Sequence, residues 1–265
     1  MDRTTYRLQH ETANIYPLGD VHLGSPACAW GAFKGAVRAA VRDPRAVVIL
    51  MGDLFDAVLP GDKRFNADEP ALALDRHYVS MRDALMPLKG RIAGVIEGNH
   101  EHKLTKLGVG SPVRRLAEDL GAPFLGFSGF VRILPCAKSD RGKWVHPAIL
   151  DIYAHHGFVA GRKRGGKVNA LEDFSLNFDA DLYLMGHCHD AFDTKRVVVG
   201  FGGARQRYFC STGTFHKTAE WGTMSYSEAK GYPIQALGAP RIRWEPNTRQ
   251  RMDGDCRLNG RLKVY

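Results

Sequence analysis

The stretch Ala46-Val-Val-Ile-Leu-Met-Gly-Asp53 decides the fold. Six apolar residues in a row, ended by glycine and aspartate, are typical of a strand that is buried on both faces. Two other runs in the first half end in the same way: Ile15–Leu18 precedes Gly19-Asp20, and Arg91–Ile96 precedes Glu97-Gly-Asn-His100. The apolar pattern between these runs predicts helices over residues 30–41, 71–88 and about 111–121. Strands that alternate with helices indicate an α/β fold.

The second half of the chain is richer in strand patterns than in helix patterns. Strand-like runs occupy residues 130–134, 148–154, 182–185, 196–199 and 208–211, and the tail 256–265 alternates enough to be a last strand. No internal repeat, low-complexity segment or linker divides the sequence. We therefore predict a single α/β domain over residues 1–265.

Composition excludes several classes of protein. The 265 residues are 44% hydrophobic and 25% charged, which is usual for a globular protein and unlike a disordered or collagen-like chain. The longest apolar run is far shorter than the roughly 18 residues of a membrane span, and the first residues hold no signal-peptide core. Five scattered cysteines suit a reducing compartment, so we expect a cytoplasmic protein without a membrane partner. The net charge of +9 favours polyanionic partners, with nucleic acid as one candidate.

Histidines gather where the predicted strands end. Six of the eleven follow strand-like runs: His22, His100, His155, His156, His187 and His189. In an open α/β sheet, ligands bind at the carboxyl ends of the strands. Side chains at i and i+2 of an extended segment point the same way, so Asp20 and His22 can reach one pocket, as can His187 and His189. Mixed carboxylate and imidazole ligands suit Mn, Fe, Zn, Co or Ni.

Five short motifs occur in a fixed order along the chain. They are Asp20-Val-His22, Gly52-Asp53, Gly98-Asn-His-Glu101, His155-His-Gly157 and Gly186-His-Cys-His189. In this order they resemble the calcineurin-like metallophosphoesterase superfamily, over about two thirds of the chain. The resemblance implies a four-layer α/β/β/α sandwich of two mixed β-sheets flanked by helices. It also implies two divalent metal ions at the carboxyl ends of the strands.

The same resemblance assigns roles to individual residues. It implies that Asp20, His22 and His189 hold a first metal ion and that Asp53 bridges to a second. Asn99, His187 and one histidine of the 155–156 pair would complete the second site. We favour His155 as that ligand, which leaves His156 near the substrate, while the choice within the pair stays open. His100 would bind no metal but would contact the substrate phosphate as the catalytic general acid.

The remaining histidines match no motif: His10, His77, His102, His146 and His216. We expect them on the surface or in the core. Cys188 lies between two ligands, and we expect its side chain to point away from them.

A basic segment follows the histidine pair. Gly161-Arg-Lys-Arg-Gly-Gly-Lys167 holds four cations and three glycines in seven residues. It could be a solvated flexible loop, or a clamp in which Arg162, Lys163, Arg164 and Lys167 contact substrate phosphates.

These patterns predict a metal-dependent phosphoesterase that acts through a dinuclear centre and a bridging hydroxide. We expect phosphodiester substrates, with nucleic acid among them, and manganese among the candidate metals. The alternatives are a small-molecule phosphatase, a cyclic-nucleotide phosphodiesterase, or a catalytically silent binding module. Retention of the full ligand set argues against the silent module.

Overall fold

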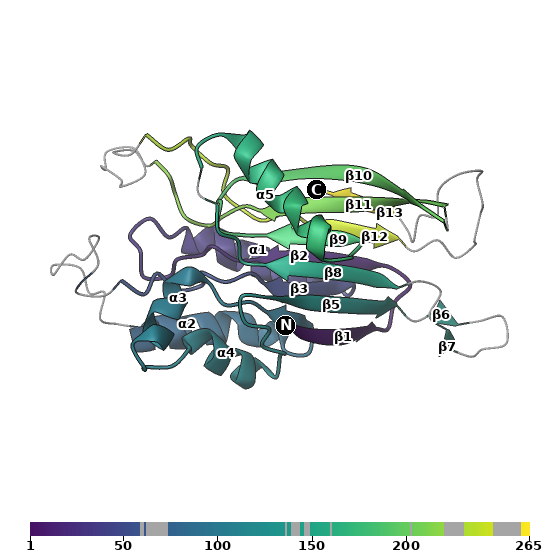
Figure 1. Cartoon of the computed structure of the whole chain (residues 1–265). Helices are drawn as coiled ribbons and strands as arrows, with labels where there is room; N and C mark the ends of the chain where they lie inside the picture. Colours follow the sequence, from purple (N-terminus) through teal and green to yellow (C-terminus); the bar gives the residue numbers. More distant parts are fainter. Residues whose placement is uncertain are drawn as a thin grey trace.

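The structure of the protein is a computed structural model, which describes residues 1–58, 61, 74–135, 137–138, 144–145, 149–159, 161–201, 203–219, 231–245 and 261–265. Two β-sheets lie face to face, and helices cover their outer faces (Figure 1). Among these residues no helix is both long and apolar enough to cross a bilayer.

The five-stranded sheet contains the apolar run that begins at Ala46. Its order is β13-β12-β2-β3-β4. Its strands are β2 (Ala13–Leu18), β3 (Ala46–Leu50), β4 (Ile92–Val95), β12 (Ile242–Glu245) and β13 (Arg261–Val264). β2, β3 and β4 are parallel to one another. β12 pairs antiparallel with both β2 and β13, so the sheet is mixed. Residues 256–260 of the predicted last strand lie outside the described residues.

The six-stranded sheet is mixed as well, in the order β1-β5-β8-β9-β11-β10. Its strands are β1 (Asp2–Leu8), β5 (Ser128–Pro135), β8 (Leu150–His155), β9 (Leu182–Met185), β10 (Ala191–Gly200) and β11 (Gly203–Thr212). β8, β9 and β11 are parallel neighbours. A separate ribbon pairs β6 (Ala137–Lys138) with β7 (Trp144–Val145).

Strand β3 serves two hydrophobic cores at once. Val47 and Ile49 belong to the core between the sheets, together with Ile152 and Leu184 of the opposite sheet. The alternate residues of β3, Val48 and Leu50, belong to the core beneath the helices, because successive side chains of a strand point to opposite faces. Both faces of β3 are therefore shielded from water, which explains why its sequence is an unbroken apolar run.

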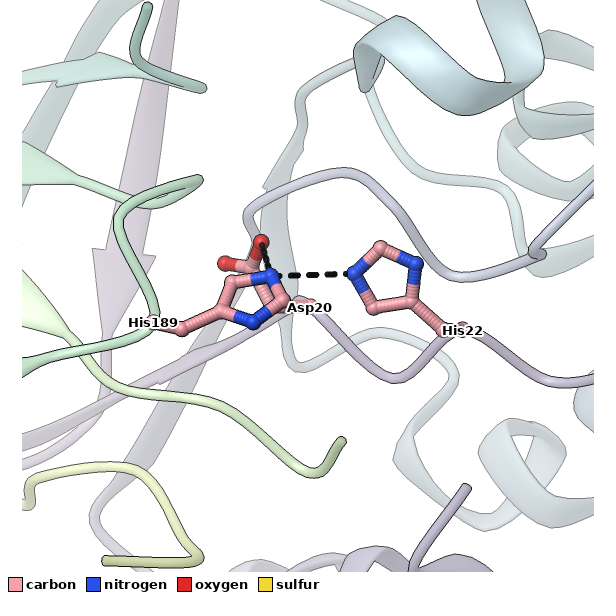
Figure 2. Close-up of side chains that lie close together, drawn as sticks. All are labelled: Asp20, His22 and His189. Carbon is pink, nitrogen blue, oxygen red and sulfur yellow. Dashed lines mark hydrogen bonds and ion pairs between the residues drawn. The ribbon is translucent and has the colours of Figure 1, made fainter. Parts of the chain in front are cut away.

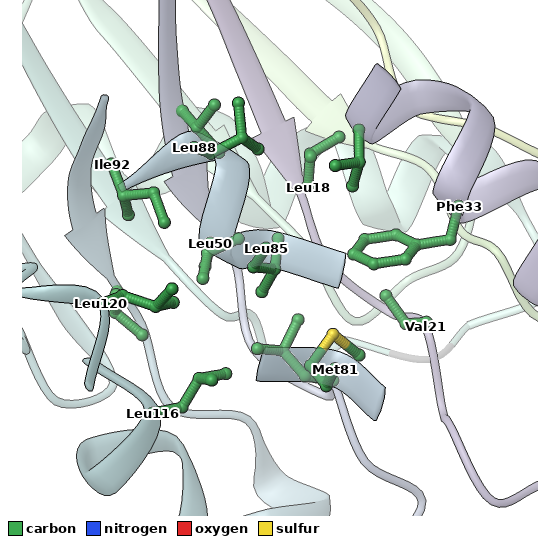
Figure 3. Packing of buried hydrophobic residues seen from close by; sticks show 14 of the residues in the cluster. Leu18, Val21, Phe33, Leu50, Met81, Leu85, Leu88, Ile92, Leu116 and Leu120 are labelled. Atoms are coloured by element: carbon green, nitrogen blue, oxygen red, sulfur yellow. The ribbon is translucent and has the colours of Figure 1, made fainter. Parts of the chain in front are cut away.

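Helices complete the four layers. They are α1 (Trp30–Arg42), α2 (Leu74–Leu85), the short 3-10 helix η1 (Met86–Leu88), α3 (Asn99–Lys106), α4 (Pro112–Leu120) and α5 (Arg164–Asn177). Phe33 of α1, Met81 of α2 and Leu116 of α4 pack on the outer face of the five-stranded sheet (Figure 3). On the other side, Leu171 and Phe174 of α5 pack on the six-stranded sheet. The predicted α/β/β/α sandwich is confirmed.

Helix α4 has the ends that its sequence indicates. The Ser111 hydroxyl accepts a hydrogen bond from the Arg114 amide at 3.0 Å, and Pro112 occupies the first turn. Gly121 ends the helix in the left-handed conformation, with φ of 63°.

The sequence patterns did not predict β1, β6, β7, β12, α3 or α5, and two of these are instructive. β1 escaped notice because its sequence is polar and only alternate residues are partly buried. Helix α5 begins inside the basic segment that we expected to be a loop. Its apolar positions Ala170, Leu171 and Phe174 have helical spacing, but the two glycines and the cations of its first turn obscure that pattern.

Candidate metal centre

The candidate ligands come from both sheets and meet at one end of the sandwich. Asp20 follows β2, Asp53 follows β3, and Asn99 begins α3 just beyond β4. The histidines of the six-stranded sheet follow β8 and β9. In the described part of the chain, three groups of side chains have possible ligand atoms within 4.8 Å of one another: Asp20, His22 and His189; His22, Asp53 and His100; and Asp53, His156 and His187.

The first group brings two imidazole nitrogens together (Figure 2). Nε2 of His189 lies 3.1 Å from Nε2 of His22 and 3.3 Å from Oδ1 of Asp20. The carboxylate of Asp20 also accepts the backbone N–H of His187 at 3.0 Å. Burial alone would raise the pKa of Asp20, but the hydrogen bond to His189 and the neighbouring imidazoles hold that pKa below its usual value. A cation between these lone pairs fits this donor set.

Asp53 belongs to two of the three groups. Its Oδ2 is 3.3 Å from Nε2 of His156 and 3.9 Å from Nε2 of both His22 and His100. Its Oδ1 accepts the backbone N–H of His100 at 2.9 Å. Although burial opposes ionisation, the surrounding imidazoles hold the pKa of Asp53 well below its usual value. Its carboxylate therefore carries a buried negative charge that imidazoles of both groups face.

The structure brings His156, rather than the favoured His155, to the third group, beside Asp53 and His187. Nδ1–H of His156 donates to the Met51 carbonyl at 2.8 Å, which leaves Nε2 facing Oδ1 of Asn99 at 3.0 Å and the Asp53 carboxylate. Both neighbours of Nε2 are acceptors, and although burial lowers the pKa of His156, the charge of Asp53 raises it to about 10. Nε2 therefore carries a proton when no metal is bound, and a divalent cation that displaced this proton would lie beside two oxygen ligands.

The correction of His155 follows from strand alternation. Ile152 and Ala154 of β8 face the core between the sheets, so Tyr153 and His155 face the helix layer. His155 accordingly stacks on Phe174 with 4.9 Å between the rings, and its Nδ1 accepts the Gly157 amide at 2.7 Å. Burial lowers the pKa of His155 to about 4. His156 lies beyond the strand end and turns towards the other sheet.

His100 lies at the edge of the centre. Its Nδ1 is 2.8 Å from the backbone oxygen of Asp56 and 3.0 Å from the Asp56 carboxylate, while Nε2 faces Asp53. Asp56 also approaches Nδ1 of His22 at 3.4 Å. Sequence reasoning missed Asp56, although it stands only three residues beyond Asp53 in the same strand-end loop.

His216 corrects a second expectation. We expected a surface or core residue, but its ring lies 5.0 Å from that of His22 and 5.9 Å from that of His189. Its Nε2 is 3.0 Å from the Ser25 hydroxyl. Burial and the neighbouring imidazoles lower the pKa of His216 to about 3. The sequence did hold a signal for this position, because His216 lies shortly after the end of β11, as the candidate ligands lie shortly after the ends of other strands.

The other unassigned histidines stay outside the three groups. His102 pairs with Glu97 at 3.2 Å, and His10 and His77 are likewise not members. His146 lies outside the described residues. Cys188 points away from the centre as expected, with its Sγ 2.9 Å from the Ser211 hydroxyl.

The backbone at the candidate ligands is strained. Five of them have left-handed φ angles although they are not glycine: Asp20 (49°), His22 (50°), Asp53 (48°), His187 (65°) and His189 (55°). Each such conformation costs about 1–3 kcal/mol and persists only where the surroundings impose it. Strain of this kind concentrates at functional sites, which supports the assignment of these residues to one.

Glu101 holds the central loop in place. It is fully buried, and its two carboxylate oxygens accept the backbone N–H groups of Asp53 at 3.2 Å and Phe55 at 2.9 Å. Burial and the charge of Asp53 raise the pKa of Glu101 to about 8. The last residue of the Gly98-Asn-His-Glu101 motif therefore positions Asp53.

Gly98→Ala is expected to lower the free energy of unfolding by about 1–3 kcal/mol or more. A Cβ on Gly98 would lie 2.1 Å from both the backbone nitrogen and Oδ1 of Asp53, so the loop must move. Gly35→Ala in α1 is the matched control, because its Cβ would meet nothing closer than 3.8 Å. In urea unfolding, the free energy of unfolding of this control should rise by about 0.5–1 kcal/mol, because alanine favours a helix more than glycine does. Equal midpoints for the two variants would show that Gly98 tolerates a side chain.

The basic segment is ordered where it joins α5. Lys163 precedes the helix, and Arg164 forms two hydrogen bonds to Asp190, at 2.7 and 3.2 Å. Lys167 is buried rather than solvated. The flexible-loop expectation therefore fails from Arg164 onwards, whereas Arg162 and Lys163 are exposed.

Comparison with known proteins gives structural neighbours but no sequence family. No protein-family model and no curated protein matches the chain. A point mutant of Vps29 from Entamoeba histolytica matches with a TM-score of 0.40 and 15% identity, over 95% of this chain and 98% of that one. A predicted phosphoesterase from Streptococcus pneumoniae matches with a TM-score of 0.35 and 12% identity, over 96% and 98%. Because both TM-scores are below 0.5, we base the description of the fold on the strand order and the layers of this structure alone.

Proposed function

We propose that this protein is a metal-dependent phosphoesterase. The observation that carries the proposal is the position of Asp53, whose buried carboxylate lies within ligand distance of His22 on one side and of His156 and His187 on the other. Such an arrangement matches the needs of two divalent cations that share a carboxylate. The order of the five motifs, with its resemblance to the calcineurin-like metallophosphoesterases, supports the same function.

The residues divide between two cation positions. Asp20, His22 and His189 would hold one ion, and His156, His187 and Asn99 would hold the other, with Asp53 between them. When bound, divalent ions supply Lewis-acid stabilisation of phosphoryl oxygens and activate water. The chain itself contributes the buried carboxylates that attract the ions and the imidazoles that fix their positions.

His100 is proposed as the proton donor to the leaving group. Asp56 fixes its Nδ1, so its Nε2 is directed towards the centre. His100→Ala should retain metal but lose about 10²–10⁴-fold in the rate for an alkyl ester, since general acid catalysis is worth that much. An aryl ester with a good leaving group should lose much less. Loss of bound metal would instead make His100 a ligand.

Phosphodiesters are the proposed substrate class, with nucleic acid as the extended form. The exposed cations Arg162 and Lys163 support this, because the next residue, Arg164, contacts Asp190 beside His189. The double variant Arg162→Ala/Lys163→Ala should flatten the log–log salt slope of oligonucleotide binding by about 1.4–1.8. Arg3→Ala/Arg7→Ala on the distant strand β1 is the control, and an unchanged slope in both would exclude this contact.

The deciding experiment compares substrates on metal-stripped protein reloaded with Mn²⁺, Zn²⁺, Ni²⁺ or Mg²⁺. The panel contains nitrophenyl mono- and bis-esters, cyclic nucleotides, and single- and double-stranded nucleic acid. Metal-dependent turnover with a higher kcat/KM for diesters supports the proposal. Preference for monoesters would indicate a small-molecule phosphatase, and metal binding without any turnover would indicate a binding module.

A further inference from the structure

Lys167 is a buried cation at the back of the candidate metal centre. Its side chain is only 4% exposed, although lysine is almost never fully buried unless it is paired. Its Nζ donates to the Cys188 carbonyl at 3.2 Å and lies 3.5 Å from Oδ2 of Asp190. Both partners belong to the loop that carries His187 and His189. Helix α5 lies over this part of the six-stranded sheet (Figure 1), so Lys167 reaches the loop from the outer layer.

The loop between β9 and β10 is held from two sides. On the inner side, the Asp20 carboxylate accepts the His187 amide. On the outer side, Asp190 is buried and binds both Arg164 and Lys167 of α5. Between these anchors, His187 and His189 keep left-handed backbone conformations that a free loop would relax.

Three features argue against a substrate-phosphate role for Lys167. Its side chain is buried, its ammonium is engaged by a carbonyl and a carboxylate, and both of these belong to the ligand loop. Burying the ammonium of a lysine is costly, so its two contacts to the ligand loop must compensate for the lost hydration. Removing the side chain would therefore free the loop at both contact points.

We propose that Lys167, through the Cys188 carbonyl and Asp190, is a positioning residue that fixes His187 and His189 in their ligand geometry. The proposal rests on the proposed function in that it takes the centre to bind metal. It assigns to the end of the Gly161–Lys167 segment a role in organising the loop rather than in contacting substrate. Partners that orient metal ligands typically change metal affinity by about 10–100-fold when they are mutated.

The test compares Lys167→Met with Lys195→Met, an exposed lysine on β10 that serves as the matched control. Mn²⁺ is titrated calorimetrically into the metal-stripped full-length protein. Lys167→Met should weaken Mn²⁺ binding by about 10–100-fold, whereas Lys195→Met should leave it unchanged. Lys167→Arg, which retains the charge, should recover part of the affinity. Unchanged affinity in folded Lys167→Met would overturn the proposal.

One further measurement separates this proposal from the function. Histidine ring NMR signals of the metal-free protein should change for His187 and His189 in Lys167→Met, and should stay the same for His102. If the parent protein binds no Mn²⁺ but these signals change, the function fails while the positioning role stands. If Lys167→Met does not fold, Asp190→Asn, which keeps the shape of the side chain, replaces it in both measurements. Unchanged signals and affinity in Asp190→Asn would likewise overturn the proposal.

Discussion

Asp53→Asn is expected to abolish phosphoester hydrolysis, with a fall in rate of about 10³-fold or more. The amide has almost the same shape as the carboxylate, and its oxygen can still accept the His100 amide hydrogen bond. It removes, however, the negative charge that two groups of imidazoles share. Elemental analysis after reloading with excess Mn²⁺ should give less than two ions per chain, together with the loss of turnover.

The control for this substitution is Asp119→Asn. Asp119 accepts a hydrogen bond from the Tyr78 hydroxyl at 2.9 Å, away from the centre, so this variant should keep its metal and its rate. If Asp53→Asn retained both ions and normal turnover, a shared carboxylate would not be needed, and the proposed two-ion centre would be wrong.

The second large effect is expected from the adjacent histidines, which form a matched pair. His156→Ala should lose at least one metal ion and most of the activity, because Nε2 of His156 faces both Asn99 and Asp53. His155→Ala should keep its metal and lose only stability, because its ring packs on Phe174. We expect that loss to be about 1–2 kcal/mol, as for a partly buried aromatic contact.

Metal content and urea unfolding of the two variants decide between these residues. The opposite result, with metal lost from His155→Ala and retained by His156→Ala, would reverse the assignment that the side-chain directions give. Equal metal loss in both would indicate that the end of β8 moves as a unit.

Strand-end chemistry made most of the centre predictable. Asp20, Asp53 and His187 each follow an apolar run, and parallel strands bring such ends to one edge. The choice between His155 and His156 was not predictable in the same way, because moving a strand end by one residue reverses the direction of a side chain. Only the observed alternation of Ile152 and Ala154 decided it.

Other parts of the fold carried weaker signals in the sequence. Helix α5 was hidden because Gly165 and Gly166 disfavour a helix, while its burial of Leu171 and Phe174 stabilises one. His216 was missed because a single histidine lacks the spacing that marks a motif. The pairing of Lys167 with Asp190 joins residues 23 positions apart, and neither has a local pattern that indicates the other.

The origin of the ligands in both sheets has a mechanical consequence. Asp20, Asp53 and Asn99 follow strands of the five-stranded sheet, whereas His156, His187 and His189 follow strands of the six-stranded sheet. Ions bound among them would cross-link the two sheets at the end of the sandwich where the backbone is strained. Chelation should then open this edge first, so amides around the strand ends would exchange with deuterium sooner than those at the opposite ends of the same strands.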